Sequence, residues 1–464
     1  MAEEIKEITT YTSKFYDYDT KRMYEQIATG QFLYLKDDKK TIVIVPEIRS
    51  KLKNGTIFII KPLDNKTTKL KAIPLPYTAT EYHSTEILIK KIYNHIHKHL
   101  DVTNRFRKIA SWYVIMTWVK DKLYTVGYLR ALGTWGHGKS RYFDVVGNLC
   151  YKPIPFAGAL TPAPLYRLMD LWSGTLLLDE CVLPNSDTSN FVVQILNSGI
   201  QRGKYVWRCD KENNNDVDPF DPFGPKIIAS REPFKDNALE SRCIDEYMKE
   251  TKRDDITVEL TPDFYKEQID LRNQLLMFRL RNWNTINAGN IKNIDFPQNT
   301  TKRLQQMIAP FAITFFKFPK IIKDLTSFAE GFYHEQVKNN SQTLQGGIVN
   351  AIWKLYLSGK EQITSADIKV EMKSLGVEVE SITDIKIGRE RSNLNIKAEQ
   401  KTVRAKSKKS IVWNDELMTT LMKRYVAEDE QKEFTDKLKR MRERVKSNPI
   451  KEDKGDDPSV DWQV

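Results

Sequence analysis

One stretch of the sequence has the residue types and spacing to hold a triphosphate. Residues 133–140 read Gly-Thr-Trp-Gly-His-Gly-Lys-Ser, a glycine and four further positions before Gly-Lys-Ser. Glycine permits backbone conformations in which consecutive N–H groups converge on phosphate oxygens, while the lysine contacts the β- and γ-phosphates and the hydroxyl contacts Mg²⁺. ATP and Mg²⁺ are therefore the expected cofactors. The predicted nucleotide site comprises Gly133, Thr134, Trp135, Gly136, His137, Gly138, Lys139 and Ser140.

Two acidic residues, Asp179 and Glu180, follow an apolar run at residues 173–178. A strand buried between helices is apolar throughout, and ligand chemistry gathers at its carboxyl end. Asp179 is expected to hold Mg²⁺, and Glu180 to orient and deprotonate the attacking water. The alternative is that the two acids only cap a helix.

A further strand is predicted at residues 226–230, and it ends in Ser230. This hydroxyl is a candidate contact for the γ-phosphate or for the attacking water. Arg242 follows in a Ser-Arg pair. Residue type and spacing alone leave it as a surface salt-bridge partner.

The elements that must position these residues form an α/β fold. An apolar strand at 126–132 precedes the glycine loop, and residues 141–149, which follow it, have helical spacing. The alternative is a glycine loop that binds no phosphate and merely turns a strand into a helix. Strands are predicted at 32–35, 41–45, 56–60 and 68–73, and a polar linker at 338–347. The predicted parts are a small β-rich N-terminal domain with a helix (1–100), an ATPase core (101–258), a helical subdomain (259–337), a C-terminal winged helix (348–428) and a charged, partly disordered tail (429–464).

Composition favours a multidomain protein with a polyanionic partner. The chain has 464 residues and a formal charge of +12, which points to nucleic acid before a membrane surface. No apolar run approaches the length of a membrane span, and the acidic N-terminus lacks the apolar segment of a signal peptide. The four scattered cysteines are interpreted as buried thiols in a reducing compartment, which predicts a cytoplasmic location.

Two basic regions are candidate DNA contacts. An alternating strand and polar turn begin at residue 204, and the alternative is a disordered surface loop. In the winged-helix region, basic residues occupy one helix and a two-stranded hairpin, where the alternative is a solvated charge run. The predicted DNA-binding residues are Lys204, Arg208, Lys211, Lys386, Arg389, Arg391, Arg404, Lys406 and Lys408.

Three histidines, His95, His97 and His99, lie on one predicted helix. His95 and His99 share a face, but no cysteine or carboxylate cluster is near in the sequence. Solvated surface histidines are therefore the preferred interpretation, and a metal site is the alternative.

The order of residues 133–140, 176–180, 226–230 and the Ser241-Arg242 pair resembles AAA+ ATPases. It resembles in particular the hexameric replicative helicases of the minichromosome maintenance (MCM) kind and of superfamily three. Residues 161–169, 196–203, 223–229 and 238–242 are similar to helicase-like replication proteins of archaeal plasmids and viruses. The resemblance covers about residues 120–320 and leaves out the N-terminal domain and the tail.

The resemblance implies a DNA helicase that works as a homo-oligomeric ring, expected to be a hexamer, together with other replication proteins in a host cytoplasm. Arg242 would be an arginine finger acting on the neighbouring subunit, and Arg303 a second sensor. Ser230 stands where such families carry asparagine, and the segment from Lys204 would be a hairpin that reaches into the ring channel. Two alternatives remain, namely a nucleotide-switched initiator or helicase loader, and a structural DNA binder with a decayed nucleotide site.

Overall fold

The computed structural model describes residues 7–51, 56–134, 136–156, 162–179, 187–209, 216–294, 296, 300–403 and 406–447. The chain forms two compact units, Met1–Ala329 and Glu330–Val464. Helix α10 (Pro319–Ser341) runs across the boundary between them.

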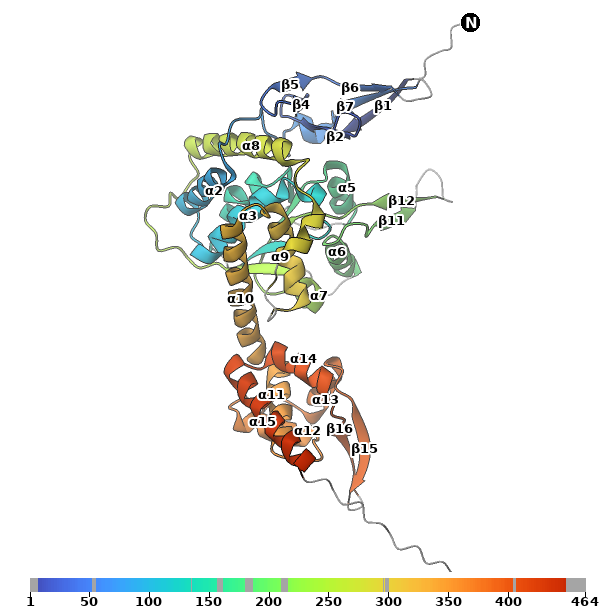
Figure 1. Cartoon of the computed structure of the whole chain (residues 1–464), viewed down its shortest axis with the longest axis vertical. Helices are drawn as coiled ribbons and strands as arrows, with labels where there is room; N and C mark the ends of the chain where they lie inside the picture. Colours follow the sequence, from blue (N-terminus) through green and yellow to red (C-terminus); the bar gives the residue numbers. More distant parts are fainter. Residues whose placement is uncertain are drawn as a thin grey trace, which may run out of the picture. The chain divides into compact units, whose positions relative to one another are not determined.

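The first unit begins with two small β-sheets (Figure 1). One sheet has the order β1-β7-β6, and the other has the antiparallel order β2-β3-β4-β5. A small core of Tyr24, Phe32, Ile48 and Ile60 stabilises them. The strands are β1 (Glu7–Thr12), β2 (Lys14–Asp17), β3 (Arg22–Gln26), β4 (Phe32–Leu35), β5 (Ile42–Val45), β6 (Ile48–Lys51) and β7 (Ile57–Pro62).

The prediction of a strand at residues 68–73 is wrong, because the chain forms the short helix α1 (Lys66–Lys69) there. The side chain of Asn65 accepts a hydrogen bond from the backbone of Thr68, and the hydroxyl of Thr68 accepts one from the backbone of Asn65. This reciprocal cap satisfies backbone groups that a strand would have left for a partner.

A five-stranded parallel sheet forms the centre of the first unit, in the order β14-β8-β13-β10-β9. The strands predicted before the phosphate loop, before Asp179 and at 226–230 are confirmed as β8, β10 and β13. All three are buried along their whole length, which is why they read as continuous runs. The strands are β8 (Tyr128–Leu132), β9 (Pro153–Phe156), β10 (Thr175–Leu178), β13 (Lys226–Ser230) and β14 (Cys243–Tyr247).

Helices cover both faces of this sheet. The chain runs from β8 through α4 (Lys139–Val145) to the edge strand β9, and then returns through α5 (Pro162–Trp172) to β10 and through α6 (Asp187–Ser198) towards β13. Because parallel crossovers are right-handed, this reversal places α4 on the face opposite α5 and α6. The carboxyl ends of the strands at such a reversal form the expected ligand edge.

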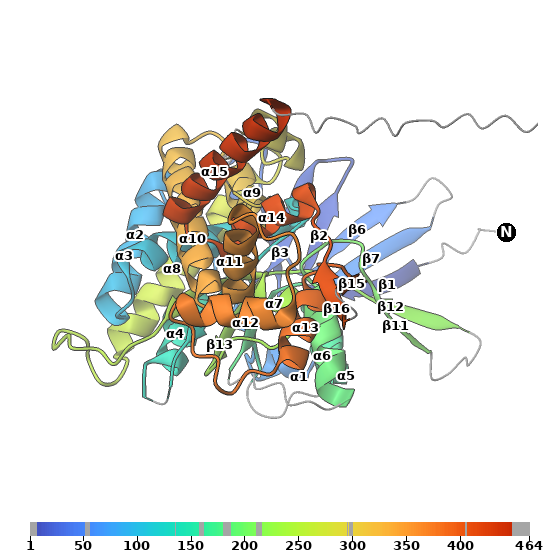
Figure 2. The ribbon, with the colours of Figure 1, turned by 90° about the horizontal axis from the view of Figure 1, so that it is seen from below.

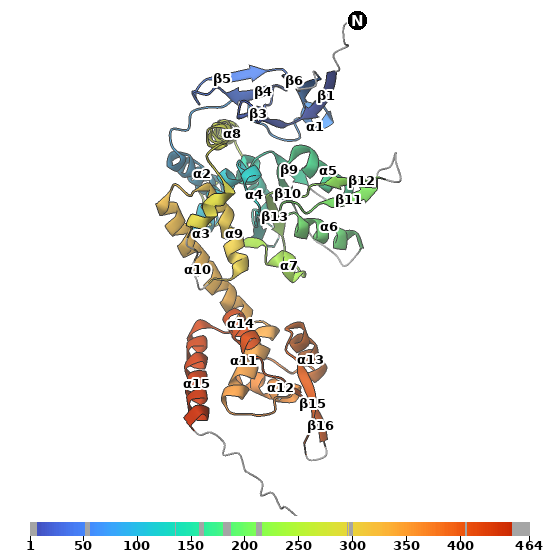
Figure 3. The ribbon, with the colours of Figure 1, turned by 45° about the vertical axis from the view of Figure 1, so that its right-hand side comes forward.

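The remaining helices of the first unit pack around this core. Helix α8 lies between the N-terminal sheets and the core helices (Figures 1 and 3). Helices α8 and α9 and the start of α10 occupy the region after residue 259, where the sequence predicts a helical subdomain. The elements are α2 (Thr85–His99), α3 (Asn104–Thr117), α7 (Asn237–Glu240), α8 (Pro262–Asn282) and α9 (Lys302–Thr314), with short 3-10 turns at Lys120–Lys122, Gly147–Leu149 and Ala288–Asn293.

A buried ion network joins the N-terminal sheets to the core. Glu25 on β3 lies 2.6 Å from Arg279 on α8 and 2.9 Å from Lys152 beside β9. The hydroxyl of Tyr151 donates to the same carboxylate at 2.9 Å. Burial alone would raise the pKa of Glu25, but Arg279 and Lys152 outweigh it and hold this pKa below its ordinary value. Glu25 is therefore a carboxylate on which the attachment of the N-terminal sheets depends.

The second unit contains the helices and the hairpin that the sequence predicts after residue 348. It has its own core, which includes Ile352, Trp353, Ile368 and Met422. The polar segment 338–347 is not an extended linker, since α10 continues to Ser341 and α11 begins at Leu344. The elements are α11 (Leu344–Leu357), α12 (Ser365–Ser374), α13 (Asp384–Asn393), β15 (Ala398–Val403), β16 (Lys406–Ile411), α14 (Asp415–Tyr425) and α15 (Glu428–Ser447).

Among the described residues, no helix combines the length and the apolar character that crossing a bilayer requires.

Candidate functional site

The phosphate loop lies between β8 and α4, as the sequence predicts. Gly136 and Gly138 have φ values of 78° and 77°, in the left-handed region that side chains disfavour. At Gly133, a Cβ atom would lie 3.2 Å from both the Cβ and the carbonyl oxygen of Met248, so a side chain there would crowd Met248. Backbone N–H groups in such a loop form a concave cradle for oxyanions. Its conformation therefore fits a polyphosphate, although Trp135 lies outside the described residues.

Lys139 is the first residue of α4, and its amine lies over the loop. Its Nζ donates hydrogen bonds to the carbonyl oxygens of Gly133 and Thr134, at 2.7 and 2.6 Å. The loop is also fixed from outside, because Nδ1 of His137 lies 3.0 Å from the carbonyl oxygen of Met248. The ammonium group is thus held where the phosphates would lie.

Ser230 and Asp179 lie at the same edge of the sheet as this loop. β13 pairs with β8 on one side and with β10 on the other, all in parallel, so their carboxyl ends converge. The backbone N–H of Gly133 donates to the carbonyl oxygen of Ser230 at 3.2 Å. The hydroxyl of Ser230 donates to the carbonyl oxygen of Glu232 at 3.0 Å, so it is engaged within its own turn. Glu180 lies outside the described residues.

Asp144 is an acidic residue near this edge that the sequence analysis missed. It lies one helical turn after Ser140 on α4, and therefore on the same face of the helix. Burial raises the pKa of Asp144, and the nearby Asp179 raises it further. The carboxylates of Asp144 and Asp179, with the hydroxyl of Ser140, are oxygen ligands of the kind that Mg²⁺ prefers. Its position one turn after the Lys-Ser pair was the only signal available in the sequence.

Arg242 lies at the opposite end of the sheet from its own phosphate loop. Its carbonyl oxygen accepts a hydrogen bond from the backbone of Tyr128, at the start of β8, whereas Gly133 follows the end of that strand. Five strand residues separate the two positions, which corresponds to roughly 16 Å along the sheet. The guanidinium turns back and donates to the carbonyl oxygen of Ala238. Arg242 therefore cannot contact phosphates bound to the loop of its own chain.

Arg303, the predicted second sensor, lies near Arg242. It is on α9, half-buried, and its guanidinium donates to Oε1 of Gln306 at 3.3 Å. Burial lowers the pKa of Arg303, and the positive charge of Arg242 lowers it further. The two arginines thus form a cationic pair at the end of the sheet away from the phosphate loop.

A buried arginine holds the corner that carries Arg242. Arg130 on β8 is 0% exposed, and its Nη2 lies 2.6 Å from Glu240 while its Nε lies 2.7 Å from Asp245. Glu240 ends α7 and Asp245 lies in β14, on either side of Arg242. This charge-assisted fork links Arg130 to the residues on either side of the turn that carries Arg242.

The predicted basic hairpin is present as β11 (Val206–Cys209) and β12 (Val217–Phe220), which pair in antiparallel fashion. It projects from the core (Figures 1, 2 and 3). Lys204 is exposed, and the guanidinium of Arg208 lies 3.9 Å from the centroid of the Phe191 ring. Trp207 is 57% exposed beside Tyr205, so aromatic surface accompanies the basic residues. Lys211 lies outside the described residues.

In the second unit, a pocket of ≈ 460 Å³ is lined by two of the predicted DNA-binding residues and by one further lysine. Arg389 and Arg391 of α13 and Lys409 of β16 line it, together with Ser365 at the start of α12. Arg391 has a structural contact, because its Nη1 donates to the carbonyl oxygen of Ile396 at 2.6 Å. Lys386 is exposed on α13 outside the lining. Arg404 and the side chains of Lys406 and Lys408 lie outside what the structure describes.

The structure contradicts the interpretation of His95 and His99 as solvated histidines and of Cys209 as a buried thiol. His95 and His99 are buried, with 0% and 7% of their surfaces exposed, because α8 packs against this face of α2. Only His97 of the three histidines is exposed.

Cys150 and Cys243 are buried as expected, but Cys209 is exposed because it lies on the projecting hairpin.

Comparisons with known proteins give structural likenesses only. No family model and no curated protein matches the chain. Among solved structures, it is similar to the C-terminal region of NrS-1, at 12% identity and a TM-score of 0.39, over 86% of this chain and 96% of that one. It is also similar to Cch of SCCmec type IV, described as an active helicase, at 11% identity and a TM-score of 0.39, over 86% of this chain and 98% of that one. At these values neither likeness bears on the activity, so the geometry of the site must carry the functional conclusion.

Proposed function

We propose that this protein is a Mg²⁺-dependent ATP hydrolase that works as a ring of identical subunits, most simply a hexamer, and translocates on single-stranded DNA to unwind duplex. The observation that carries the proposal is the separation between the phosphate loop and Arg242 at opposite ends of one sheet. A site that needs both must be completed by a second copy of the chain.

The loop residues would hold the triphosphate through their backbone N–H groups, and Lys139 would contact its terminal phosphates. Ser140 and Asp179, with Asp144 close by, would hold Mg²⁺, which would neutralise the charge developing on the phosphate oxygens. Glu180, the residue after Asp179, would orient and deprotonate the water. The carbonyl oxygen of Ser230 would support the loop by accepting the hydrogen bond from Gly133. Contact between the hydroxyl of Ser230 and the γ-phosphate, the role predicted from the sequence, would be secondary.

The cationic pair supports catalysis between subunits. Two neighbouring guanidinium groups repel each other, and an anion placed between them removes that repulsion. The triphosphate of an adjoining subunit is such an anion. Arg242 would then stabilise the transition state in trans, with Arg303 beside it, and each active site would lie at a subunit boundary.

DNA binding is supported by two features on separate elements. The β11–β12 hairpin carries Arg208 and an exposed tryptophan, and Lys204 lies just before it in the chain. This is the combination that grips a single strand through phosphates and base stacking. The pocket lined by Arg389 and Lys409 suits the phosphates of a duplex, in keeping with the winged-helix interpretation.

The same pocket favours a second candidate function. Initiators and helicase loaders combine a nucleotide switch with a duplex-binding module and need no processive unwinding. Under this alternative the protein would bind DNA in an ATP-dependent manner without separating its strands.

Unwinding of a forked DNA duplex at stoichiometric protein separates these candidates. We expect DNA-stimulated phosphate release and strand separation by the wild type, and DNA binding without strand separation by Lys139→Ala and by Glu180→Gln. ATP-dependent DNA binding by a wild type that separates no strands would favour the initiator. Strand separation by Lys139→Ala at the wild-type rate would refute the nucleotide site.

The second-unit pocket makes a prediction about salt dependence. Replacing Arg389 or Lys409 with alanine should weaken duplex binding for all sequences and reduce the slope of log affinity against log salt by about one each. Lys373 is an exposed cation on α12 outside this pocket, so Lys373→Ala is the control. Fluorescence anisotropy with labelled duplex over a range of salt measures the slopes, and equal slopes for all four proteins would exclude the pocket as a phosphate contact.

A further inference from the structure

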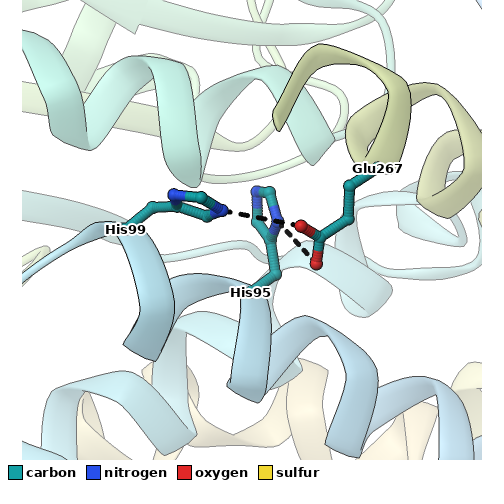
Figure 4. A group of neighbouring side chains, drawn as sticks. All are labelled: His95, His99 and Glu267. Atoms are coloured by element: carbon teal, nitrogen blue, oxygen red, sulfur yellow. Dashed lines mark ion pairs between the residues drawn. The ribbon is translucent and has the colours of Figure 1, made fainter. Parts of the chain in front are cut away.

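Two histidines and a glutamate, none of them assigned to ATP or DNA, converge between α2 and α8 (Figure 4). His95 and His99 lie one turn apart on α2, and Glu267 reaches them from α8. Nδ1 of His95 lies 3.2 Å from Oε1 of Glu267, and Nε2 of His99 lies 3.5 Å from Oε2. One potential ligand atom from each residue lies within 4.8 Å of the others.

Three of the four histidine nitrogens at this place are buried and lack a hydrogen-bond partner within the part of the chain that the structure describes. Both ring nitrogens of His95 and Nε2 of His99 lack a hydrogen-bond partner among the described residues, despite the short contacts with Glu267. A buried polar atom without a partner costs about 1–3 kcal/mol, so such atoms call for an explanation. The ring of Phe264 stacks on His95 and meets His99 edge-on, which fixes both imidazoles in place.

Each histidine lies about as far from a carboxylate oxygen of Glu267 as two ligands of a small divalent cation lie from each other, and one ligand atom from each of the three residues lies within 4.8 Å of the others. Zn²⁺ binds histidine nitrogens and carboxylate oxygens at about 2.0–2.2 Å in tetrahedral geometry, which places neighbouring ligand atoms about 3.3–3.6 Å apart. The contacts of 3.2 and 3.5 Å between the histidines and Glu267 lie close to this range. Two imidazoles with one carboxylate also form a donor set that favours zinc over calcium or magnesium.

The geometry points to a zinc site formed by His95, His99 and Glu267. Glu267 retains 34% side-chain exposure, so the ion can enter from solvent and keep a water molecule as its fourth ligand. Nζ of Lys98 lies 3.3 Å from Oε2 of Glu267, but Lys98 is 62% exposed and can move into solvent. Bound zinc would link α2 to α8, the helix that also carries Arg279 of the buried network.

The test uses the full-length protein, stripped with EDTA and then titrated with Zn²⁺ alone in the absence of nucleotide. We expect one equivalent bound per chain, and an increase in the thermal midpoint of about 5 °C or more at a zinc concentration 100-fold above the dissociation constant. Co²⁺ in place of zinc should give the visible absorption of a tetrahedral site. Absence of stoichiometric zinc binding would overturn the proposal.

Variants assign the bound metal to these residues. Glu267→Gln keeps the shape of a partly exposed side chain, and we expect it to weaken zinc binding at least 10-fold while retaining the wild-type circular dichroism; His99→Asn should do the same. His97→Ala lies on the same helix but faces solvent, and Cys209→Ser removes the exposed thiol, so both controls should bind zinc as the wild type does. Unchanged binding by Glu267→Gln, or its loss in His97→Ala or Cys209→Ser, would place the metal elsewhere and refute the site.

Discussion

Replacement of Arg242 by alanine is expected to lower ATP turnover by about 10³-fold while nucleotide affinity stays within a few-fold of the wild type. The reason is geometric, because Arg242 lies roughly 16 Å along the sheet from the loop of its own chain and makes no contact with nucleotide bound there. Its contribution would come only when an adjoining subunit presents a triphosphate. Steady-state phosphate release and the binding of a fluorescent nucleotide measure the two quantities separately.

Two further variants make this prediction specific. Arg242→Lys should stay close to the alanine variant, because a lysine lacks the planar fork that stabilises several phosphate oxygens at once. Arg253 pairs with Asp255 in a surface loop, so Arg253→Ala should hydrolyse ATP as the wild type does. A loss of nucleotide affinity in Arg242→Ala as large as its loss of turnover would contradict a role confined to the transition state.

Replacement of Glu25 by glutamine is expected to lower the free energy of unfolding by about 3–5 kcal/mol. The glutamine keeps the size of the side chain but leaves Arg279 and Lys152, both buried, without their shared carboxylate. Arg279 retains Asp121 at 2.7 Å, whereas Lys152 retains only oxygen atoms of Ser13 among its described hydrogen-bond partners. Urea denaturation followed by near-ultraviolet circular dichroism measures the change.

A matched control is an ion pair with another arginine of α8. Glu81 pairs with Arg281 of α8 at 2.6 Å, but its side chain is 46% exposed, so Glu81→Gln should cost less than about 1 kcal/mol. Equal effects of the two substitutions would show that burial of the Glu25 network is not what stabilises this part of the molecule.

The same carboxylate predicts an acid dependence. The pKa of Glu25 is lower in the folded protein than its ordinary value of 4.5, so the unfolded chain binds a proton first as the pH falls. Its contribution is therefore fully present above pH 4.5 and is lost as the pH falls through the folded pKa. In Glu25→Gln this part of the acid dependence should disappear, and an unchanged loss of stability below pH 4.5 would contradict the assignment.

The elements next to the phosphate loop could be predicted because local sequence determines them. β8, β10 and β13 are buried and mostly apolar, and the glycine spacing of the loop identifies the turn between β8 and α4. The helix and the basic hairpin predicted in the second unit are also local features, and the side chain of Thr364 caps the start of α12. The strand predicted at 68–73 failed because the side-chain cap at Asn65 outweighed an alternating pattern.

Features that depend on distant packing could not be predicted. His95 and His99 looked solvated because Glu267 and Phe264 come from a helix about 170 residues later in the chain. The proximity of Arg242 to Arg303 likewise depends on how α9 packs beside the start of β8, where Met307 lies next to Gly127. Glu25 reads as one polar residue in a strand, and only the tertiary structure makes it the centre of a buried network.

The most direct measurement mixes two inactive variants, Arg242→Ala and Lys139→Ala, and records ATP turnover. In a head-to-tail ring assembled at random from equal amounts, about a quarter of the boundaries combine an intact loop from one variant with an intact arginine from the other. We expect the mixture to recover roughly a quarter of the wild-type turnover, while each variant alone stays near background. Mixed assemblies that remain as inactive as their components, or an Arg242→Ala protein that turns over ATP like the wild type, would contradict an active site shared between two subunits.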